Sequence, residues 1–369
     1  MKETLFYSFV FIYVLGLIYL AITLPIGPNE AKVYYTDSGI LHYFTHLFKG
    51  WFGNGLEFRL PFLFFALLNI ALFFIMSQHY FIKVEKSYFA TSVFMLLPGI
   101  ITSAVLVNIA VVVISLVLAF IIFYEKKRVV CQALMMLLLL FVHDASVIFF
   151  VGVTLFSAFT RNKKLFTISI AFLAVNLLYL NNLSIEGRPQ GEFLELFGLY
   201  IALFSPLVFI YFFYALYRIW LREKKDILWY VSFTAFVLSI LLSLRQQVDM
   251  TDFAPYVIVS VVLMLVLYHQ TVEVRLPRFQ VWYRRVFVLI VSSLILSAMI
   301  IFFHQLFFFL LKDKTKHFTY AFYEPYWQMQ ELNEIGQDCY TVSSQKVQYQ
   351  LKYYGIDKCE DLDVPKIHR

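Results

Sequence analysis

A small number of ionisable side chains interrupt a chain that is otherwise strongly apolar. Glu30 lies in the segment GPNEAKVYY (residues 27–35), directly after the first apolar stretch, while His143 and Asp144 stand side by side between two later apolar stretches. Carboxylates and imidazoles accept and donate protons, so these residues could carry acid–base chemistry. Two ionisable residues between apolar helices are also costly unless they are paired or face a cavity. The simpler interpretation of Glu30 is a solvated carboxylate beside Lys32.

Residues 40–48 hold a second pattern with chemical meaning. His42 and His46 stand four residues apart and would share one face of a helix. Such a pair can bind zinc, but the glutamate of an HExxH arrangement is missing. A helix lying on the membrane surface explains the same residues together with Trp51. We favour the surface helix over a metal site.

The composition places most of the chain in a lipid bilayer. Of its 369 residues, 61% are hydrophobic and 15% are charged, and the mean hydropathy is +0.75. Soluble domains are about half apolar and about a quarter charged. The net charge of +6 gives no argument for nucleic-acid binding, because its meaning depends on which side of the membrane the basic residues occupy.

Long apolar runs predict a bundle of transmembrane helices. A helix needs about 20 apolar residues to cross the hydrocarbon core, or somewhat fewer where the bilayer thins. The first run has no small-residue cleavage site after it and is predicted to be a retained signal anchor. The fifth and sixth runs, joined only by His143-Asp144, are alternatively one long helix or a re-entrant pair. We predict about eleven spans, near residues 5–25, 58–79, 87–103, 106–124, 129–143, 145–160, 165–181, 195–217, 227–244, 254–272 and 286–311.

The basic residues predict the orientation of these spans. With the N-terminus in the cytoplasm, the inner loops hold sixteen Lys and Arg and the outer loops hold five. Basic residues favour the inner side, so this asymmetry supports that orientation. The inner runs at 125–128 and 222–225 are expected to bind anionic lipid headgroups. The five basic residues of the outer loops are Lys32, Lys49, Arg59, Arg188 and Arg245.

Residues 312–369 differ in character and are predicted to form a small α/β cap on the outer face. They hold an amphipathic stretch (326–335), a predicted strand (339–343) and a predicted helix (345–354) that ends at Gly355. Cys339 and Cys359 could form a disulfide there, since an outer compartment is oxidising. The chain is thus divided into a transmembrane module, residues 1–311, with a long first outer loop (26–57), and the C-terminal cap.

Several short motifs, taken in order, give the chain a family resemblance. Asn29-Glu30-Ala31 follows the first span, an aromatic-rich loop comes next, and Gly55 with Arg59-Leu60-Pro61 opens the second span. Leu106-Val107-Asn108 opens the fourth span, His143-Asp144 lies in an outer kink, and RQQVDMTDFAPY (245–256) enters a late span. In order, side and spacing, these motifs resemble the GT-C superfamily of glycosyltransferases, most closely its protein O-mannosyltransferase and aminoarabinose-transferase branch.

The resemblance implies an all-α integral membrane enzyme that works on the outer side of a bacterial inner membrane, with a cytoplasmic N-terminus and a periplasmic C-terminus. Its donor would be a polyprenyl-phosphate-linked sugar and its acceptor a hydroxyl of a lipid, a glycan or a protein. A divalent cation (Mg²⁺ or Mn²⁺) could serve as cofactor, and no nucleic acid is expected. The acceptor hydroxyl loses its proton to a base as it attacks the anomeric carbon with inversion, while cations or donors stabilise the departing phosphate.

The resemblance also implies roles for particular residues. Glu30 is the candidate general base, with Asp37 in reserve and Asp144 as another acid able to serve. The candidates for binding the donor phosphate are Arg59, His143 and Arg245. Further candidates for the site are Asn29, Asn108 and Tyr256.

Two of these positions leave other functions open. Members of the family usually have Asp where Asn29 stands and often an acid where Asn108 stands, and an amide cannot act as a general base. A non-catalytic GT-C-like membrane protein is therefore one alternative. A lipid or glycolipid transporter is another, although transporters place ionisable residues near the membrane midplane, in related halves of the chain.

Overall fold

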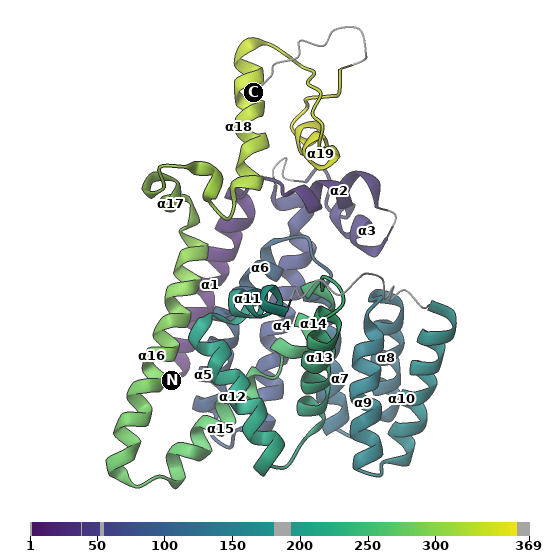
Figure 1. Ribbon diagram of the computed structural model, residues 1–369, viewed down its shortest axis with the longest axis vertical. Coiled ribbons are helices and arrows are strands. Elements are labelled where there is room, and N and C mark those ends of the chain that lie inside the picture. The colour runs from purple at the N-terminus through teal and green to yellow at the C-terminus, as the bar shows by residue number, and fades with distance from the viewer. Residues whose placement is uncertain (1, 38, 52–54, 181–192, 360–369) are drawn as a thin grey trace. The chain divides into compact units, whose positions relative to one another are not determined.

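The chain is predominantly helical in the residues described by the computed structural model, which are 2–37, 39–51, 55–180 and 193–359 (Figure 1). Apolar runs fold as helices because a helix pairs its own N–H and C=O groups where no water can reach them. A π-helical turn, η1 (Asn176–Leu180), and a 3-10 turn, η2 (Lys314–Lys316), accompany the α-helices. In chain order the α-helices are α1 (Glu3–Thr23), α2 (Pro28–Thr36), α3 (Ile40–His46), α4 (Leu56–Tyr80), α5 (Val84–Leu96), α6 (Pro98–Val105), α7 (Ala110–Glu125), α8 (Val129–Val142), α9 (Ser146–Phe159), α10 (Lys163–Val175), α11 (Phe193–Phe204), α12 (Pro206–Arg222), α13 (Ile227–Ser243), α14 (Met250–Ile258), α15 (Val261–Val274), α16 (Pro277–Phe302), α17 (His304–Leu310), α18 (Tyr320–Ile335) and α19 (Gln345–Tyr353).

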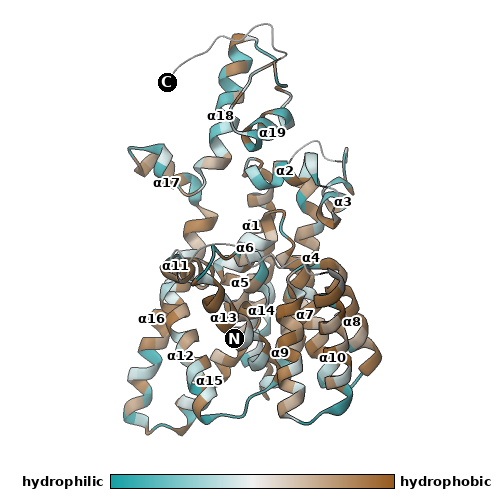
Figure 2. Cartoon of the chain, turned by 45° about the vertical axis from the view of Figure 1, so that its right-hand side comes forward, coloured by the Kyte–Doolittle hydropathy of each residue, from teal (hydrophilic) through white to brown (hydrophobic). Residues whose placement is uncertain are grey.

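The described helices fit an integral membrane protein. Four stretches, Glu3–Thr23, Leu56–Tyr80, Met250–Val274 and Pro277–Phe302, are long and apolar enough to cross a membrane, and two bent helix pairs raise the number to six. Figure 2 shows apolar residues along the helices and hydrophilic residues in many of the turns that join them. Eleven spans and a cytoplasmic N-terminus stay predictions, and Arg188 lies outside the described residues.

Proline marks the break in both bent pairs. Leu97 precedes Pro98 and has ψ 127°, which ends α5 and turns the chain by 64° into α6. Proline disfavours the helical conformation at the residue before it, so the break follows from the sequence. Ser205, before Pro206, has φ +75°, and there α11 and α12 meet at 105°. The His143-Asp144 junction is likewise a break between two separate helices, α8 and α9.

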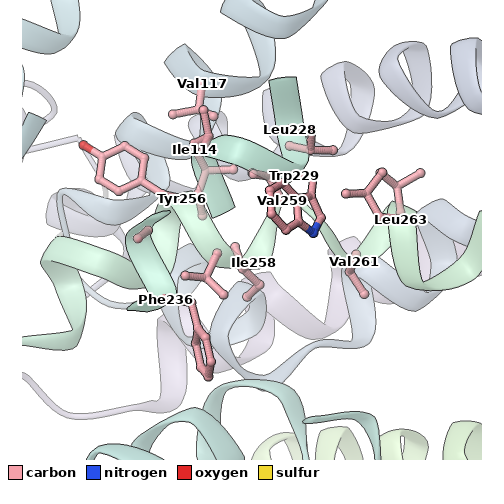
Figure 3. Close-up of a cluster of buried hydrophobic side chains, with 14 of the residues drawn as sticks. Ile114, Val117, Leu228, Trp229, Phe236, Tyr256, Ile258, Val259, Val261 and Leu263 are labelled. Carbon is pink, nitrogen blue, oxygen red and sulfur yellow. The ribbon is translucent and has the colours of Figure 1, made fainter. Parts of the chain in front are cut away.

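The chain divides into two compact units, which are described separately. Unit 1 comprises the chain up to Val14, Phe64–Ala104 and Asn108–Ala298. In its core, side chains of α13 and α14 pack with residues of α7 and α15 (Figure 3). Trp229 and Phe236 of α13 and the fully buried Tyr256 of α14 are among them. Helix α13 also packs along α9.

Unit 2 comprises Leu15–Leu63, Val105–Val107 and the residues from Met299 onward. Helix α2 of the first loop packs on α19 near the C-terminus, and α18 packs on α19 from another side. The predicted domain boundary at residue 311 therefore falls inside this unit.

The prediction of an α/β cap is not supported. The described part of residues 312–369 forms helices and one isolated parallel bridge, between Cys339 and Asp357, in place of the strand predicted at 339–343. Only two backbone hydrogen bonds join these segments, Tyr340 N–H to Asp357 C=O and Asp357 N–H to Asp338 C=O. A strand needs a longer partner ladder than this. The disulfide between Cys339 and Cys359 is present and holds the two segments together.

Gly152 marks a close approach of two helices in unit 1. A Cβ atom at this position would lie 2.8 Å from the Cα atom of Val231, so only glycine lets the backbones of α9 and α13 approach this closely. We predict that Gly152→Val destabilises the protein by about 1–3 kcal/mol, measured as the free energy of unfolding in detergent. Gly198→Ala in α11, where a Cβ meets nothing within 4 Å, is the matched control and is expected to be neutral or stabilising. Equal losses in both variants would contradict the close packing.

Candidate functional site

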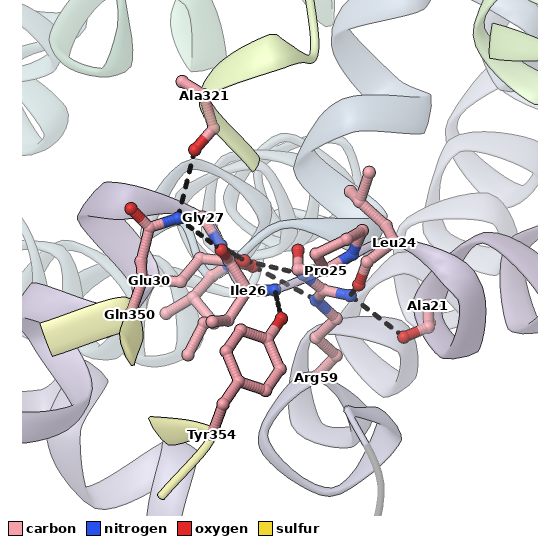
Figure 4. Close-up of polar contacts among 11 residues, drawn as sticks. Ala21, Leu24, Pro25, Ile26, Gly27, Glu30, Arg59, Ala321, Gln350 and Tyr354 are labelled. Carbon is pink, nitrogen blue, oxygen red and sulfur yellow. Dashed lines mark hydrogen bonds and ion pairs between the residues drawn. The ribbon is translucent and has the colours of Figure 1, made fainter. Parts of the chain in front are cut away.

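The carboxylate of Glu30 is buried and accepts four hydrogen bonds (Figure 4). Its Oε1 accepts from the N–H of Val107 at 3.0 Å and from Nε of Arg59 at 3.2 Å. Its Oε2 accepts from the N–H of Gly27 at 2.8 Å and from Nη2 of Arg59 at 2.6 Å. A carboxylate offers about four lone-pair positions, so all of them are filled.

The local sequence explains why Glu30 points inward at this place. Gly27 is extended and caps α2, and Pro28 supplies the first helical position with a preset φ. Glu30 is then the third helical residue, and its carboxylate returns to the N–H of the cap, as in a capping box. The positive end of the helix dipole also favours a carboxylate there.

Arg59 uses all five N–H groups of its guanidinium within unit 2. Besides the two bonds to Glu30, Nη1 donates to the carbonyls of Ala21 (3.0 Å) and Leu24 (2.6 Å), and Nη2 donates to that of Pro25 (3.0 Å). The side chain is fully buried, and its Cζ lies 4.8 Å from the ring centroid of Phe58. These hydrogen bonds join the C-terminal end of α1 to the start of α4.

Glu30 and Arg59 thus join three segments that are far apart in the sequence. These are residues 21–31, 55–61 and 105–107, which include three of the motifs that carry the family resemblance. In this arrangement the pair has a structural role. Proton abstraction by Glu30, or phosphate binding by Arg59, requires a substrate to displace one of these hydrogen bonds, so both roles stay predictions.

Other candidates of the first loop lie on the surface of unit 2. Asn29 is exposed, and its Oδ1 accepts from Nζ of Lys346 at 2.9 Å. Asp37 is exposed at the end of α2 and accepts from the N–H of Gly39. In unit 1, Asn108 precedes α7 and its Oδ1 accepts from the N–H of Ala110 at 2.9 Å.

A second polar cluster lies in unit 1, around His143. Its Nδ1 is 2.7 Å from the hydroxyl of Tyr256, and its Nε2 is 3.6 Å from Oδ1 of Asp252. His143 is buried and Asp252 is partly exposed, so the imidazole lies between a tyrosine and a carboxylate. The structure thus brings together two predicted residues, His143 and Tyr256, while Asp144 and Arg245 are exposed.

Asp252 lies within the motif 245–256 but was not chosen as a candidate, because a plain outer loop was the simpler interpretation. It stands four residues before Tyr256 on α14, so both side chains share a helix face. That spacing, next to a buried tyrosine in an apolar helix, is the signal that could have identified it.

Unit 2 contains a cavity of about 690 Å³ beside the Glu30–Arg59 pair. One wall is the segment 22–26, whose carbonyls at Leu24 and Pro25 accept from Arg59, and α4, α17, α18 and α19 contribute the others. Its polar groups include Gln305 and Lys314, and Lys314 Nζ lies 5.0 Å from the ring centroid of Trp327. Its aromatic lining consists of Phe58, Phe308, Phe309, Tyr323, Tyr326, Trp327, Tyr353 and Tyr354.

Gln350 of α19 and Tyr354, directly after this helix, hydrogen-bond to the wall formed by segment 22–26 (Figure 4). The buried Gln350 donates to the carbonyls of Ile26 (2.7 Å) and Ala321 (3.1 Å). Tyr354 accepts from the N–H of Ile26 at 3.1 Å. Burial raises the pKa of Tyr354 to about 12, so its hydroxyl keeps its proton at neutral pH and can donate into the cavity.

The sequence also held a signal for this cavity. Tyr323, Tyr326 and Trp327 stand three and four residues apart on α18, a spacing that places three aromatic rings on one helix face. Three large aromatic side chains on one face of a helix in the most polar part of the chain are unusual for a solvated cap.

A metal site is not found among the described residues. No three His, Cys, Asp or Glu side chains there gather as a metal ion requires. The rings of His42 and His46 lie 4.2 Å apart between centroids, tilted by 37°, but each directs its Nδ1 to a backbone carbonyl, of Val33 and His42 respectively.

A histidine network borders the cavity at Tyr323. His317 Nδ1 accepts from the N–H of Thr319, so the proton is on Nε2, which donates to the carbonyl of His304 at 3.0 Å. Protonation of Nδ1 would break the bond to Thr319. Burial lowers the pKa of His317 below its ordinary value, which agrees with a neutral ring.

The lowered pKa of His317 predicts a loss of stability in acid. The unfolded chain binds this proton more readily than the folded chain. The stability that the neutral His317 ring contributes is therefore complete above pH about 6.5 and is lost as the pH falls below it. We expect the free energy of unfolding to fall between pH 7.5 and pH 5, and to fall less in His317→Gln. An equal pH dependence in both proteins would contradict this.

The Glu30–Arg59 pair predicts a large effect of one neutralising change. Glu30→Gln leaves Arg59 as an unpaired buried cation, and we expect a loss of about 3–5 kcal/mol in the free energy of unfolding. Asp37→Asn removes the same charge from the exposed end of α2 and should change stability by less than about 0.5 kcal/mol. Titration with a denaturing detergent measures both. Similar values for the two variants would show that the pair does not stabilise the fold.

A scan of the chain against protein-family models and a search of the curated proteins each give no match.

Proposed function

We propose that the chain is a membrane glycosyltransferase of the GT-C type, which transfers a sugar from a polyprenyl-phosphate carrier to an acceptor hydroxyl on the outer side of the membrane. The observation that carries the proposal is the meeting of three motif segments at one carboxylate. Residues 29–31, 55–61 and 105–107 are distant in sequence, yet Glu30 accepts hydrogen bonds from both of the other segments. Three of the motifs that suggested the family thus belong to one hydrogen-bonded network.

The adjacent cavity has chemistry suited to a phosphate-linked sugar. Aromatic faces bind the apolar faces of sugar rings, and a lysine ammonium binds a phosphate through charge-assisted hydrogen bonds. Lys314 has no carboxylate within 4.0 Å among the described residues, so its charge is available to an anion. The volume of about 690 Å³ lies within the range of small-ligand sites, about 300–1,000 Å³.

The reaction proposed is a single displacement with inversion. The acceptor oxygen forms a bond to the anomeric carbon while the bond from that carbon to the phosphate oxygen breaks, and the phosphate keeps the electron pair. A carboxylate takes the hydroxyl proton. Glu30 can do this if the acceptor displaces one of its four donors, and the exposed Asp37 is the other acid of unit 2 proposed for the role. In unit 2, Lys314 joins Arg59 as a candidate for stabilising the phosphate.

Two observations favour a second candidate function. Every lone-pair position of Glu30 is occupied, and Asn29, where the family usually has an acid, accepts from Lys346. Both features suit a non-catalytic GT-C-like membrane protein that binds a lipid-linked sugar without transferring it.

A transfer assay distinguishes these two functions. Purified protein is given polyprenyl-phosphate sugars and hydroxyl acceptors, and the transferred sugar is measured. Lys314→Gln should raise the KM for the donor about tenfold or more, the value of one charge-assisted hydrogen bond. Lys316→Gln is the matched control, because Lys316 is exposed two residues away and does not line the cavity.

The acids are tested in the same assay. If Glu30 is the base, Glu30→Gln protein that is still folded transfers no sugar, while Asp144→Asn protein retains transfer. Transfer by folded Glu30→Gln at the wild-type rate would remove Glu30 from the chemistry. Donor binding by wild type without transfer to any acceptor would favour the second function.

A further inference from the structure

A second large cavity lies in unit 1, between the C-terminal ends of α12 and α15. Its volume is about 860 Å³, and the two helices pack against each other along its floor. Three arginines, Arg218, Arg222 and Arg275, line it, together with one carboxylate, that of Glu223. The face on which it opens is the one that the distribution of basic residues predicts to be cytoplasmic.

Two of the three guanidinium groups are held in place. Arg218 donates from Nη1 to the hydroxyl of Thr271 at 3.0 Å, and Thr271 is itself buried on α15. The guanidinium of Arg275 stacks on the ring of Tyr283 with its Cζ 4.5 Å from the centroid, and the hydroxyl of Tyr283 is 2.8 Å from that of Tyr211. Pre-positioned guanidinium groups lose less conformational freedom when they bind an anion.

These arginines are also not neutralised by the protein. Within the described residues, none of the three has a carboxylate within 4.0 Å, whereas Arg59 of unit 2 does. Three guanidinium groups and one carboxylate, that of Glu223, line the cavity, so its net charge is positive and favours an anion. Guanidinium groups are suited to phosphate because their N–H groups match its oxygens in pairs.

The rim of the cavity is apolar and exposed. Leu221 is 57% exposed and Val274 is 87% exposed, and the neighbouring Tyr217 is 49% exposed. Large apolar side chains beside arginines at the end of membrane helices suit a ligand with a phosphate at one end and hydrocarbon chains at the other. Basic pockets between membrane helices on the cytoplasmic side bind anionic lipid headgroups in this way.

We propose that this cavity binds the phosphate headgroup of an anionic phospholipid, held by Arg218, Arg222 and Arg275, with the acyl chains along the exposed apolar residues of α12 and α15. The site is independent of the proposed glycosyltransferase activity, because none of its residues is among the candidates for transfer. It also gives Arg222, the first residue of the basic run at 222–225, a defined ligand in place of a general attraction to the membrane surface.

The test measures lipid binding to the full chain in detergent by native mass spectrometry. Phosphatidylglycerol, phosphatidylcholine and inorganic phosphate are the three probes. We expect phosphatidylglycerol to bind more tightly than phosphatidylcholine, and inorganic phosphate at millimolar concentration not to displace it. The triple variant Arg218→Gln, Arg222→Gln, Arg275→Gln should weaken phosphatidylglycerol binding about tenfold or more.

The matched control removes the same charge from nearby positions. Arg278, Arg284 and Arg285 are exposed on α16 and do not line the cavity, so their triple Gln variant should bind phosphatidylglycerol as wild type does. Equal weakening in both triple variants would show a diffuse surface attraction and overturn the proposal. Displacement of the lipid by inorganic phosphate would identify a soluble anion as the ligand and would also overturn it.

A single substitution keeps the test decisive if the triple variant does not fold. Arg222 is exposed, and Arg222→Gln removes one guanidinium without breaking a contact to Thr271 or Tyr283. Weaker binding of phosphatidylglycerol by this variant than by Arg284→Gln supports the site, and equal binding contradicts it.

Discussion

The buried ion pair between Glu30 and Arg59 is the interaction on which unit 2 depends. A buried guanidinium is tolerated only when its charge is paired and all its N–H groups have acceptors. Here the five donors reach Glu30 and three backbone carbonyls at the end of α1, while the carboxylate also receives the N–H groups of Gly27 and Val107. Removing either partner would leave several buried groups unsatisfied at once.

This pair also helps to fix one wall of the neighbouring cavity. The carbonyls that accept from Arg59 belong to the same segment that forms one wall of the cavity, and Gln350 and Tyr354 fix that segment from the side of α19. A rigid wall with Lys314 and several aromatic rings around it suits a substrate that must be held in one orientation. A role for Glu30 in the chemistry would therefore couple catalysis to the stability of the unit, because the same lone pairs serve both.

The sequence predicted the parts of this molecule that depend on local patterns. Apolar runs identified the helices, and the cysteines at 339 and 359 pair. The bends at Pro98 and Pro206, which lie inside the predicted spans 87–103 and 195–217, were not predicted. Glu30 was singled out as a carboxylate directly after the first apolar stretch, and Arg59 was a candidate through the family resemblance. What they contact could not be predicted, since Val107 and the carbonyls of Ala21, Leu24 and Pro25 carry no side-chain signal. The predicted strand at 339–343 was wrong, because a strand pattern in the sequence does not show whether a partner strand lies beside it. The cavity around Lys314 could not be predicted, because it depends on packing between segments that are distant in the sequence.

A double-mutant cycle on the free energy of unfolding tests the central claim most directly. The proteins are wild type, Glu30→Met, Arg59→Met and the double variant, all unfolded in the same detergent. Each single variant leaves one buried charge unpaired, whereas the double variant leaves none, so we predict that the double variant is more stable than either single variant. The coupling energy should exceed about 2 kcal/mol, within the range for residues in one network. If the two single losses simply add in the double variant, the pair does not hold the three segments together.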